Sequence, residues 1–382
     1  MSVTAAAGFL AAGVSAGIKA DGALDLALVT ADHACPTAAV FTSSLAAAAP
    51  VQVSRAHIAS GRARAVVLNS GCANAGTGAT GVSAANAMCE RVGIELGVDP
   101  TEVLVCSTGP IGTRMPDDLP DRVPGLVAAL GADGSAAADA ILTTDSRAKE
   151  AAATLDGGWT VGGMAKGAGM LRPDMATMLA VLTTDAVVDR ARVGSMLRRA
   201  VDLTFNSLNV DGCQSTNDTV ILMSSGASEI SPDHDEFEDA LTAVCRQLAW
   251  QMAEDAEGAS RVVTIEVLGA ANDGDARRLG KAIADSALVR TSFYGGDPNW
   301  GRLLAAAGVA GVAFEPDAFD VSYQGIDVAR NGVAVDHDEA AILELMDGDL
   351  EVKVRVGPGS GEALIVTTDL TPAYVQLNGE RS

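Results

Sequence analysis

The chain has 382 residues, of which 48% are hydrophobic and only 3% aromatic, so a large core can be built mainly from alanine, valine, leucine and isoleucine. Its formal net charge is −23 at pH 7, and it has no basic stripe that could displace counterions from phosphate groups. The charge therefore argues against nucleic acid as a partner.

The cysteines and the start of the chain indicate the compartment. Six cysteines are scattered along the sequence and none forms a CxxC pair, so the spacing gives no pattern for a zinc site. The first residues lack a basic segment before their apolar residues, and no apolar window approaches the roughly 18 residues of a membrane helix. We expect a cytoplasmic protein with reduced thiols and no membrane span.

The first part of the chain predicts strands and helices in irregular alternation. Apolar runs at 24–30 and 37–42 predict a hairpin, and further strands are predicted at 65–69 and 103–106. Helices are predicted at 53–61, 82–96, 117–130 and 135–142.

The glycine-rich loop after residue 69 partly matches a nucleotide-binding motif. Gly76, Gly78 and Gly81 satisfy GxGxxG. However, the first glycine lies seven residues beyond the predicted strand, and the next strand ends in Cys-Ser-Thr instead of an acidic ribose ligand. This context disfavours nucleotide binding, which is kept only as a distant alternative.

The strand at 103–106 continues into Ser107-Thr108-Gly109-Pro110. The hydroxyl of Thr108 and the N–H of Gly109 can project together and form an oxyanion hole. A tight turn that uses glycine and proline for conformational reasons is the alternative, and this stretch alone favours it.

The second part of the chain predicts a longer series of elements. One helix is expected to begin at Ser231-Pro232 and to reach about Glu257, with Gly258 ending it. Glu257 would then lie where the helix dipole disfavours a carboxylate, which indicates either a cationic partner or an ordinary exposed glutamate. The other predictions are strands at 159–161, 178–182, 219–223, 262–267, 318–323, 350–355 and 363–368, helices at 190–203 and 273–286, and a loop at 296–302.

The stretch from Gly162 to Asp185 is the strongest candidate for a functional site. It carries Lys166 among glycines, and then Ala176-Thr177 directly before an apolar strand. The sequence has no GxSxG, HExxH or Walker A motif, and its four histidines lie in polar surroundings. A threonine can act without histidine if its own α-amine is free, because that amine titrates near pH 8. Thr177 would then require cleavage after Ala176; packing of a β-branched strand residue is the alternative.

Several motifs in chain order resemble the glutamate N-acetyltransferase (ornithine acetyltransferase) family of arginine biosynthesis. The central match is KGAGMLRPDMATML, which contains the Ala176-Thr177 pair. The others are NSGCANAGTG at 69–78, CSTGPIG at 106–112, TTDS at 143–146, STNDT at 215–219, DAEGAS at 255–260 and DPNWGR at 297–302.

The resemblance implies a role for each matching residue. Thr177 would be the nucleophile released by self-cleavage after Ala176, and Thr108 with Gly109 would form the oxyanion hole. The implied substrate contacts are Thr143, Lys166, Thr177, Glu257 and Asn378. The tail departs from the family pattern after Asn378 and ends at Ser382, so the equivalent of the last family contact stays open.

The resemblance also implies a fold and a reaction. We expect an α/β (α+β) fold with layered β-sheets flanked by helices, similar to N-terminal-nucleophile enzymes. It would consist of an α chain, 1–176, and a β chain, 177–382, that share one core and assemble as a heterotetramer of two α and two β chains. The implied reaction moves an acetyl group from N2-acetyl-L-ornithine to L-glutamate through an acetyl-threonine, without metal or organic cofactor. Acetyl-CoA as a second donor stays open, and a self-processing amidase or aminopeptidase is the alternative function.

Overall fold

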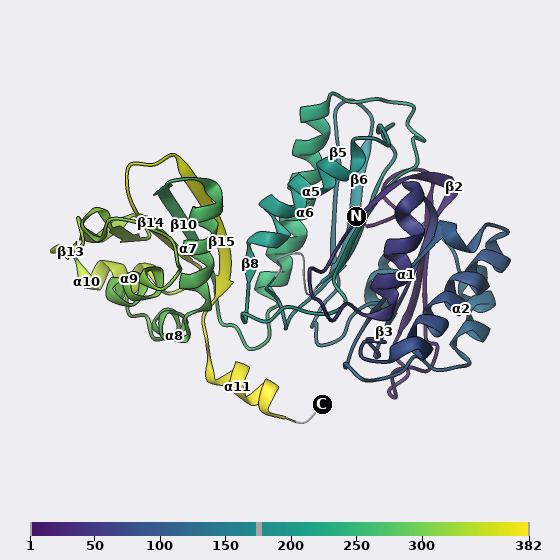
Figure 1. The fold of residues 1–382 in the computed structure, drawn as a ribbon, viewed down its shortest axis with the longest axis horizontal. Helices are drawn as coiled ribbons and strands as arrows, with labels where there is room; N and C mark the ends of the chain where they lie inside the picture. The colour runs from purple at the N-terminus through teal and green to yellow at the C-terminus, as the bar shows by residue number, and fades with distance from the viewer. Residues whose placement is uncertain (1, 173–177, 381–382) are drawn as a thin grey trace. The chain divides into compact units, whose positions relative to one another are not determined.

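The computed structural model describes residues 2–172 and 178–380, which form two compact units. The larger unit consists of 1–206 and 213–252, and the smaller one of 207–212 and 253–382. Each unit contains a β-sheet with helices packed against it (Figure 1). The predicted α/β class with layered sheets and helices is confirmed.

Among the described residues, the larger unit has an eight-stranded sheet in the order β4-β3-β2-β9-β7-β6-β5, with β1 paired to β2. The strands are β1 (Phe9–Val14), β2 (Leu26–Phe41), β3 (Arg62–Ser70), β4 (Val103–Thr108), β5 (Lys149–Thr154), β6 (Thr160–Lys166), β7 (Leu179–Thr184) and β9 (Thr219–Ser224). The helices are α1 (Ala49–His57), α2 (Gly78–Leu96), α3 (Val123–Ala128), α4 (Ser135–Ala140), α5 (Val193–Leu203) and α6 (His234–Glu254).

This sheet is buried on both faces, because alternate residues of its strands enter two different cores. Leu28 and Val67 pack with residues of α1 and α2, such as Val53 and Met88. Their neighbours along the strands pack on the opposite face with α4 and the N-terminal segment. The continuous apolar runs of the sequence follow from this burial on both sides.

The predicted hairpin at 24–30 and 37–42 is wrong, because β2 is one strand of 16 residues. It pairs with β3 along its first part and with β9 from Thr37 to Phe41. A register shift between Thr30 and Cys35 lets the strand pass its exposed residues Asp32 and His33 without a turn. Those polar residues explain the mistaken prediction.

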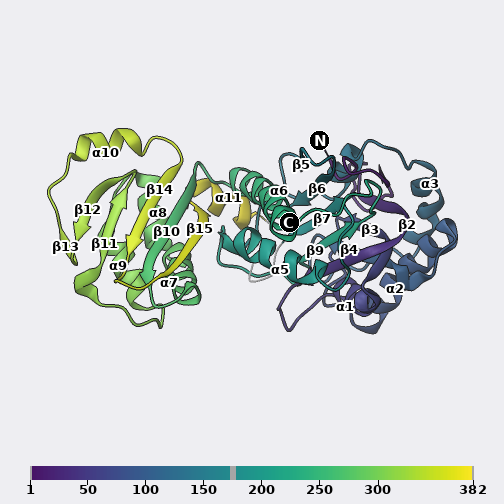
Figure 2. The same cartoon turned by 90° about the horizontal axis from the view of Figure 1, so that it is seen from above.

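The strands on either side of residue 177 are neighbours in this sheet (Figure 2). β6 pairs antiparallel with β7, placing Lys166 opposite Leu179, and β7 pairs parallel with β9, placing Leu179 opposite Thr219. Segments before and after the predicted cleavage point therefore share one hydrogen-bonded sheet. The division into 1–176 and 177–382 stays a prediction, since 173–177 lie outside the described residues.

In the described part of the smaller unit, the sheet has seven strands in the order β13-β12-β11-β14-β10-β15-β8. Its core includes Ile265 of β10, Val352 of β14 and Leu279 of α7. The strands are β8 (Leu208–Asn209), β10 (Val262–Ala270), β11 (Asp320–Tyr323), β12 (Ile326–Arg330), β13 (Val333–Ala334), β14 (Leu350–Arg355) and β15 (Gly361–Thr368). The helices are α7 (Asp273–Asp285), α8 (Ala287–Gly295), α9 (Trp300–Gly308), α10 (Glu339–Leu345) and α11 (Pro372–Gly379).

Helix α6 differs from its prediction at both ends. It begins at His234 because the Asp233 carboxylate accepts the N–H of Asp235 at 3.0 Å, so Asp233 caps the helix in place of Ser231. It ends at Glu254, which leaves Glu257 in the following turn and outside the last helical turn. The predicted dipole mismatch at Glu257 is therefore wrong.

Several other elements differ from the predictions or were not predicted. The region 117–130 is helical only as a 3₁₀ turn at 119–122 and α3. Strand β5 and helices α8, α9, α10 and α11 were not predicted. Within 2–172 and 178–380, no helix combines the length and apolarity needed to span a membrane.

Candidate active site

Lys166 brings three of the predicted site residues together in the larger unit. It is the last residue of β6, and its side chain is 10% exposed. Its ammonium group donates to Thr143 Oγ1 at 2.7 Å and to Thr108 Oγ1 at 3.2 Å. Three segments far apart in the sequence thus converge on one cation, which can hold a carboxylate.

Asp145 balances the charge of this cluster, and its role was missed from the sequence. Its fully buried carboxylate lies 2.6 Å from Lys149 Nζ and 3.8 Å from Lys166 Nζ. It also accepts the backbone N–H groups of Gly167 at 2.7 Å and Thr143 at 3.1 Å. Burial alone would raise the pKa of Asp145, but the charges of Lys166 and Lys149 and the hydrogen bonds from Lys149 and Gly167 together lower it to about 2.

The backbone at Gly109 has a conformation and surroundings that only glycine fits. Its φ is +139°, and an added Cβ would lie 2.5 Å from the backbone nitrogen of Cys72. Gly109 directly follows Thr108, the end of β4, and both residues are half-buried. A close approach of two loops therefore requires the glycine, and this conformational requirement agrees with the tight-turn alternative as well as with an oxyanion hole.

Asp218 is a second buried acid, and it contacts Met178, the residue that follows the predicted nucleophile in the chain. It precedes β9, is 4% exposed, and accepts a hydrogen bond from the backbone N–H of Met178. Burial raises the pKa of Asp218 well above its usual range, and the Met178 N–H and the Lys166 charge oppose only part of this effect. Asp218 lies within the STNDT motif, but local sequence gives no sign that this acid is buried.

The predicted nucleophile Thr177, the cleavage partner Ala176 and the tail residue Ser382 lie outside the described residues. The described chain resumes at Met178, whose carbonyl accepts the N–H of Thr219 at 3.0 Å. The described residues that bear on this part of the site are Met178, which follows Thr177 in the chain, and Asp218, which accepts the N–H of Met178.

Glu257 and Asn378 meet in the smaller unit. Asn378, on helix α11, donates its side-chain amide to Glu257 Oε2 at 3.0 Å. Gly258 permits this approach, because it has a φ of +65° and an added Cβ would lie 2.3 Å from the backbone nitrogen of Tyr374. The two predicted contacts thus form one polar pair, with Asn378 exposed and Glu257 half-buried.

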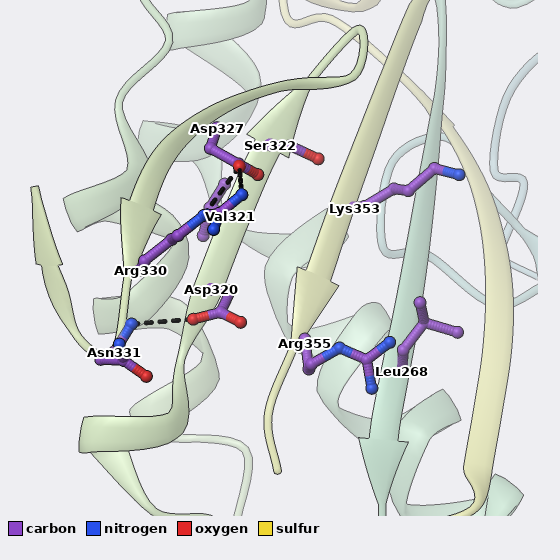
Figure 3. Close-up of a pocket in the computed structure, with 9 residues that line it drawn as sticks. All are labelled: Leu268, Asp320, Val321, Ser322, Asp327, Arg330, Asn331, Lys353 and Arg355. Carbon is purple, nitrogen blue, oxygen red and sulfur yellow. Dashed lines mark hydrogen bonds and ion pairs between the residues drawn. The ribbon is translucent and has the colours of Figure 1, made fainter. Parts of the chain in front are cut away.

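A pocket on the smaller unit contains none of the predicted site residues. It has a volume of about 330 Å³ and lies on the sheet of the smaller unit (Figure 3). Arg330 is paired with Asp327 there, and Asp320 accepts the backbone N–H of Asn331. The remaining lining residues are Leu268, Val321, Ser322, Lys353 and Arg355.

Comparisons with known proteins place this geometry in context. The model of the ArgJ family matches residues 10–382. The arginine biosynthesis bifunctional protein ArgJ of Thermobifida fusca (strain YX) is 49% identical over 389 residues, covering 100% of both chains. The protein of that name from Mycobacterium tuberculosis (strain ATCC 25618 / H37Rv) is 48% identical over 399 residues, covering 100% of this chain and 96% of the relative.

A solved structure is also similar. The crystal structure of arginine biosynthesis bifunctional protein argJ from Bacillus halodurans has 35% sequence identity and a TM-score of 0.52. The match covers 53% of this chain and 99% of that chain. About half of this chain is therefore similar in structure to a solved member of the family.

Proposed function

The chain belongs to the ArgJ family, acyltransferases of arginine biosynthesis, and we propose from this premise that it transfers the acetyl group of N2-acetyl-L-ornithine to L-glutamate. The products are L-ornithine and N-acetyl-L-glutamate. The two half-reactions share an acetyl ester on Thr177.

Each half-reaction balances with the groups of the proposed site. The α-amine of Thr177 takes the proton of Thr177 Oγ as that oxygen attacks the acetyl carbon, and Thr108 with Gly109 stabilises the oxyanion. Collapse breaks the amide, and the amine returns the proton to the leaving ornithine nitrogen. The glutamate amine then attacks the ester and gives up a proton, and Thr177 Oγ–H is restored.

One observation carries this proposal. The hydroxyl groups of Thr108 and Thr143 meet at the ammonium group of Lys166, which lies opposite Leu179 at the start of β7. The proposed oxyanion donor Thr108, at the end of β4, thus lies next to the proposed substrate cation Lys166, at the end of the strand β6 that pairs with β7. This arrangement supports acyl transfer more strongly than a merely structural role for Thr177.

The substrate contacts follow from the chemistry of each side chain. Lys166 can hold a substrate carboxylate with the help of Thr143. Glu257 can accept from an ammonium group, and Asn378 can donate as well as accept. We include Glu257 and Asn378 as substrate contacts because of the family resemblance.

Two donor specificities are considered: acetylornithine alone, or acetylornithine together with acetyl-CoA. The relatives from T. fusca and M. tuberculosis are both named bifunctional proteins. We therefore include acetylation of glutamate from acetyl-CoA as a second activity. Assaying N-acetylglutamate formation from glutamate and acetyl-CoA alone separates a bifunctional enzyme from one that uses only acetylornithine.

The alternative is an amidase or aminopeptidase with the same nucleophile, in which water takes the acyl group. The test is to incubate the protein with acetylornithine in the presence and absence of glutamate. We expect N-acetylglutamate when glutamate is present and little free acetate. Release of acetate at a rate independent of glutamate would favour the hydrolase.

Self-cleavage is tested by mass spectrometry under denaturing conditions. We expect two fragments, 1–176 and 177–382. Under native conditions they should stay associated as a heterotetramer of two α and two β chains. We expect this assembly to be cytoplasmic. Thr177→Ala should give a single chain without transferase activity. Full activity in that variant would contradict the mechanism.

A further inference from the structure

Asn217 joins two loops that meet at Gly109. It is 6% exposed, and its side-chain amide nitrogen donates to the carbonyl of Ala73 at 2.7 Å and to that of Ser107 at 2.8 Å. Both N–H bonds of the amide are thereby used. Ala73 belongs to the loop after β3, and Ser107 lies near the end of β4.

These two carbonyls flank the proposed oxyanion donors. Ser107 directly precedes Thr108 and Gly109, while Ala73 directly follows Cys72, which Gly109 approaches closely. A second link joins the same loops, because Ser107 Oγ donates to Asn69 Oδ1 at 2.6 Å and Asn69 Nδ2 donates to the Cys72 carbonyl at 3.0 Å. The side chains of Asn217, Asn69 and Ser107 thus hold together the two segments that meet at Gly109.

The orientation of the Asn217 amide is itself fixed. Thr216 Oγ1 donates to Asn217 Oδ1 at 2.7 Å, so the amide nitrogen must face the two carbonyls. Ser215 Oγ accepts the backbone N–H of Asn217 at 3.1 Å. Asn217 therefore cannot turn away from the loops without breaking several hydrogen bonds.

Asn217 also connects these loops to the strand that follows the proposed nucleophile. Two residues after Asn217, the N–H of Thr219 donates to the carbonyl of Met178 at 3.0 Å. Met178 directly follows Thr177 in the chain. A short backbone path thus links the segment of the attacking group to the loops of the oxyanion donors.

We propose that Asn217 is a positioning residue for the oxyanion hole, which it keeps in register with the β7–β9 pair. The inference rests on the proposed function, because it assigns Thr108 and Gly109 to the oxyanion. Donors of this kind must be held within about 0.5 Å of their working position. If the donors are displaced, they stabilise the transition state less, while the binding of the substrate changes little. The displacement therefore lowers kcat and leaves KM nearly unchanged.

The test compares Asn217→Ala with a matched control, Asn86→Ala. Asn86 lies on α2, and its amide donates to one carbonyl of its own helix at 3.0 Å. For Asn217→Ala we expect complete cleavage, a kcat lower by about 10- to 100-fold and a KM within about threefold, since removing a donor outright costs about 10²–10³ in rate. Asn86→Ala should keep the kcat and KM of the wild type.

A second variant decides the matter if Asn217→Ala does not fold. Thr216→Val removes the hydroxyl that orients the Asn217 amide but leaves Asn217 in place, and it should lower kcat several-fold without raising KM. A folded Asn217→Ala with wild-type kcat, or with only KM raised, overturns the inference, and so does an unchanged kcat in Thr216→Val. A wild-type protein that does not transfer acetyl groups overturns the proposed function itself, together with this inference.

Discussion

The two groups of proposed substrate contacts differ in how they are held. Around Lys166 in the larger unit, the charged groups are almost fully buried, and Asp145 pairs with two lysines and accepts two backbone N–H groups. In the smaller unit, Glu257 and Asn378 share one side-chain hydrogen bond, and Asn378 is exposed.

The Lys166 group should therefore be rigid, and the Glu257–Asn378 pair should be able to rearrange. A buried charge is costly unless it is paired and hydrogen-bonded, so each member of the Lys166 group depends on the others. An exposed polar pair is weak and its side chains can rearrange at little cost. Substitutions in the first group should therefore change both stability and activity, whereas those in the second should change activity alone.

The largest effect is expected for Asp145→Ala. Removing this carboxylate takes away the charge that lies 2.6 Å from the buried Lys149 ammonium. Breaking a buried pair in this way typically costs about 3–5 kcal/mol of unfolding free energy, measurable by urea denaturation. Asp327→Ala is the control, because it removes an exposed partner of Arg330 and should change stability far less. Equal losses in the two variants would contradict the comparison.

Acid should remove part of the same stabilisation. The pKa of Asp145 is lowered from 3.8 to about 2, so its contribution is complete above about pH 4 and is lost as the pH falls through 2. The contribution is on the order of 2 kcal/mol. Unfolding free energies measured from pH 5 to pH 2.5 should fall more steeply for the wild type than for Asp145→Asn. If the unfolding free energies of the two proteins fall equally with pH, Asp145 does not cause the loss of stability in acid.

Lys166→Met should reduce activity strongly and stability less than Asp145→Ala does. Asp145 keeps Lys149 as its partner, while the proposed carboxylate site loses its cation. Loss of a charge-assisted hydrogen bond corresponds to about 1.5–3 kcal/mol, so kcat/KM should fall about 10- to 100-fold. Steady-state kinetics together with denaturation curves measure both effects. An unchanged kcat/KM would remove Lys166 from the substrate site.

The smallest effect is expected for Glu257→Gln. The amide keeps the shape and a hydrogen bond but loses the charge for a substrate ammonium, so KM should rise about tenfold. The denaturation midpoint should stay that of the wild type, because the Glu257–Asn378 pair contributes little to stability. A lowered midpoint with unchanged KM would reverse the assignment and make the pair structural.

The proposed site residues stay a prediction, although the structure brings three of them together. Motifs from separate segments placed Thr108, Thr143 and Lys166 on the list of site residues, and the structure brings these three together. The role of Asp145 was not predictable, because its burial depends on the pairing of β5 with β6 and on Gly167 at the end of that pair. No local pattern encodes such contacts.

The strand predictions failed where local and global preferences diverge. The polar residues Asp32 and His33 and the following Pro36 are typical of a turn, yet they lie within the single strand β2. Pairing with β3 on one part and with β9 on the other keeps the strand continuous. Tertiary partners thus override the local turn preference.

The antiparallel pairing of β6 with β7 has a consequence for the thermodynamics of the mature protein. Once the proposed cleavage has separated Ala176 from Thr177, this strand pair joins two polypeptides instead of one. Unfolding then releases two molecules from each folded pair, so the midpoint of denaturation depends on protein concentration and refolding becomes a second-order process. In the uncut chain, by contrast, both strands belong to one polypeptide, so their pairing is intramolecular and its midpoint is independent of protein concentration.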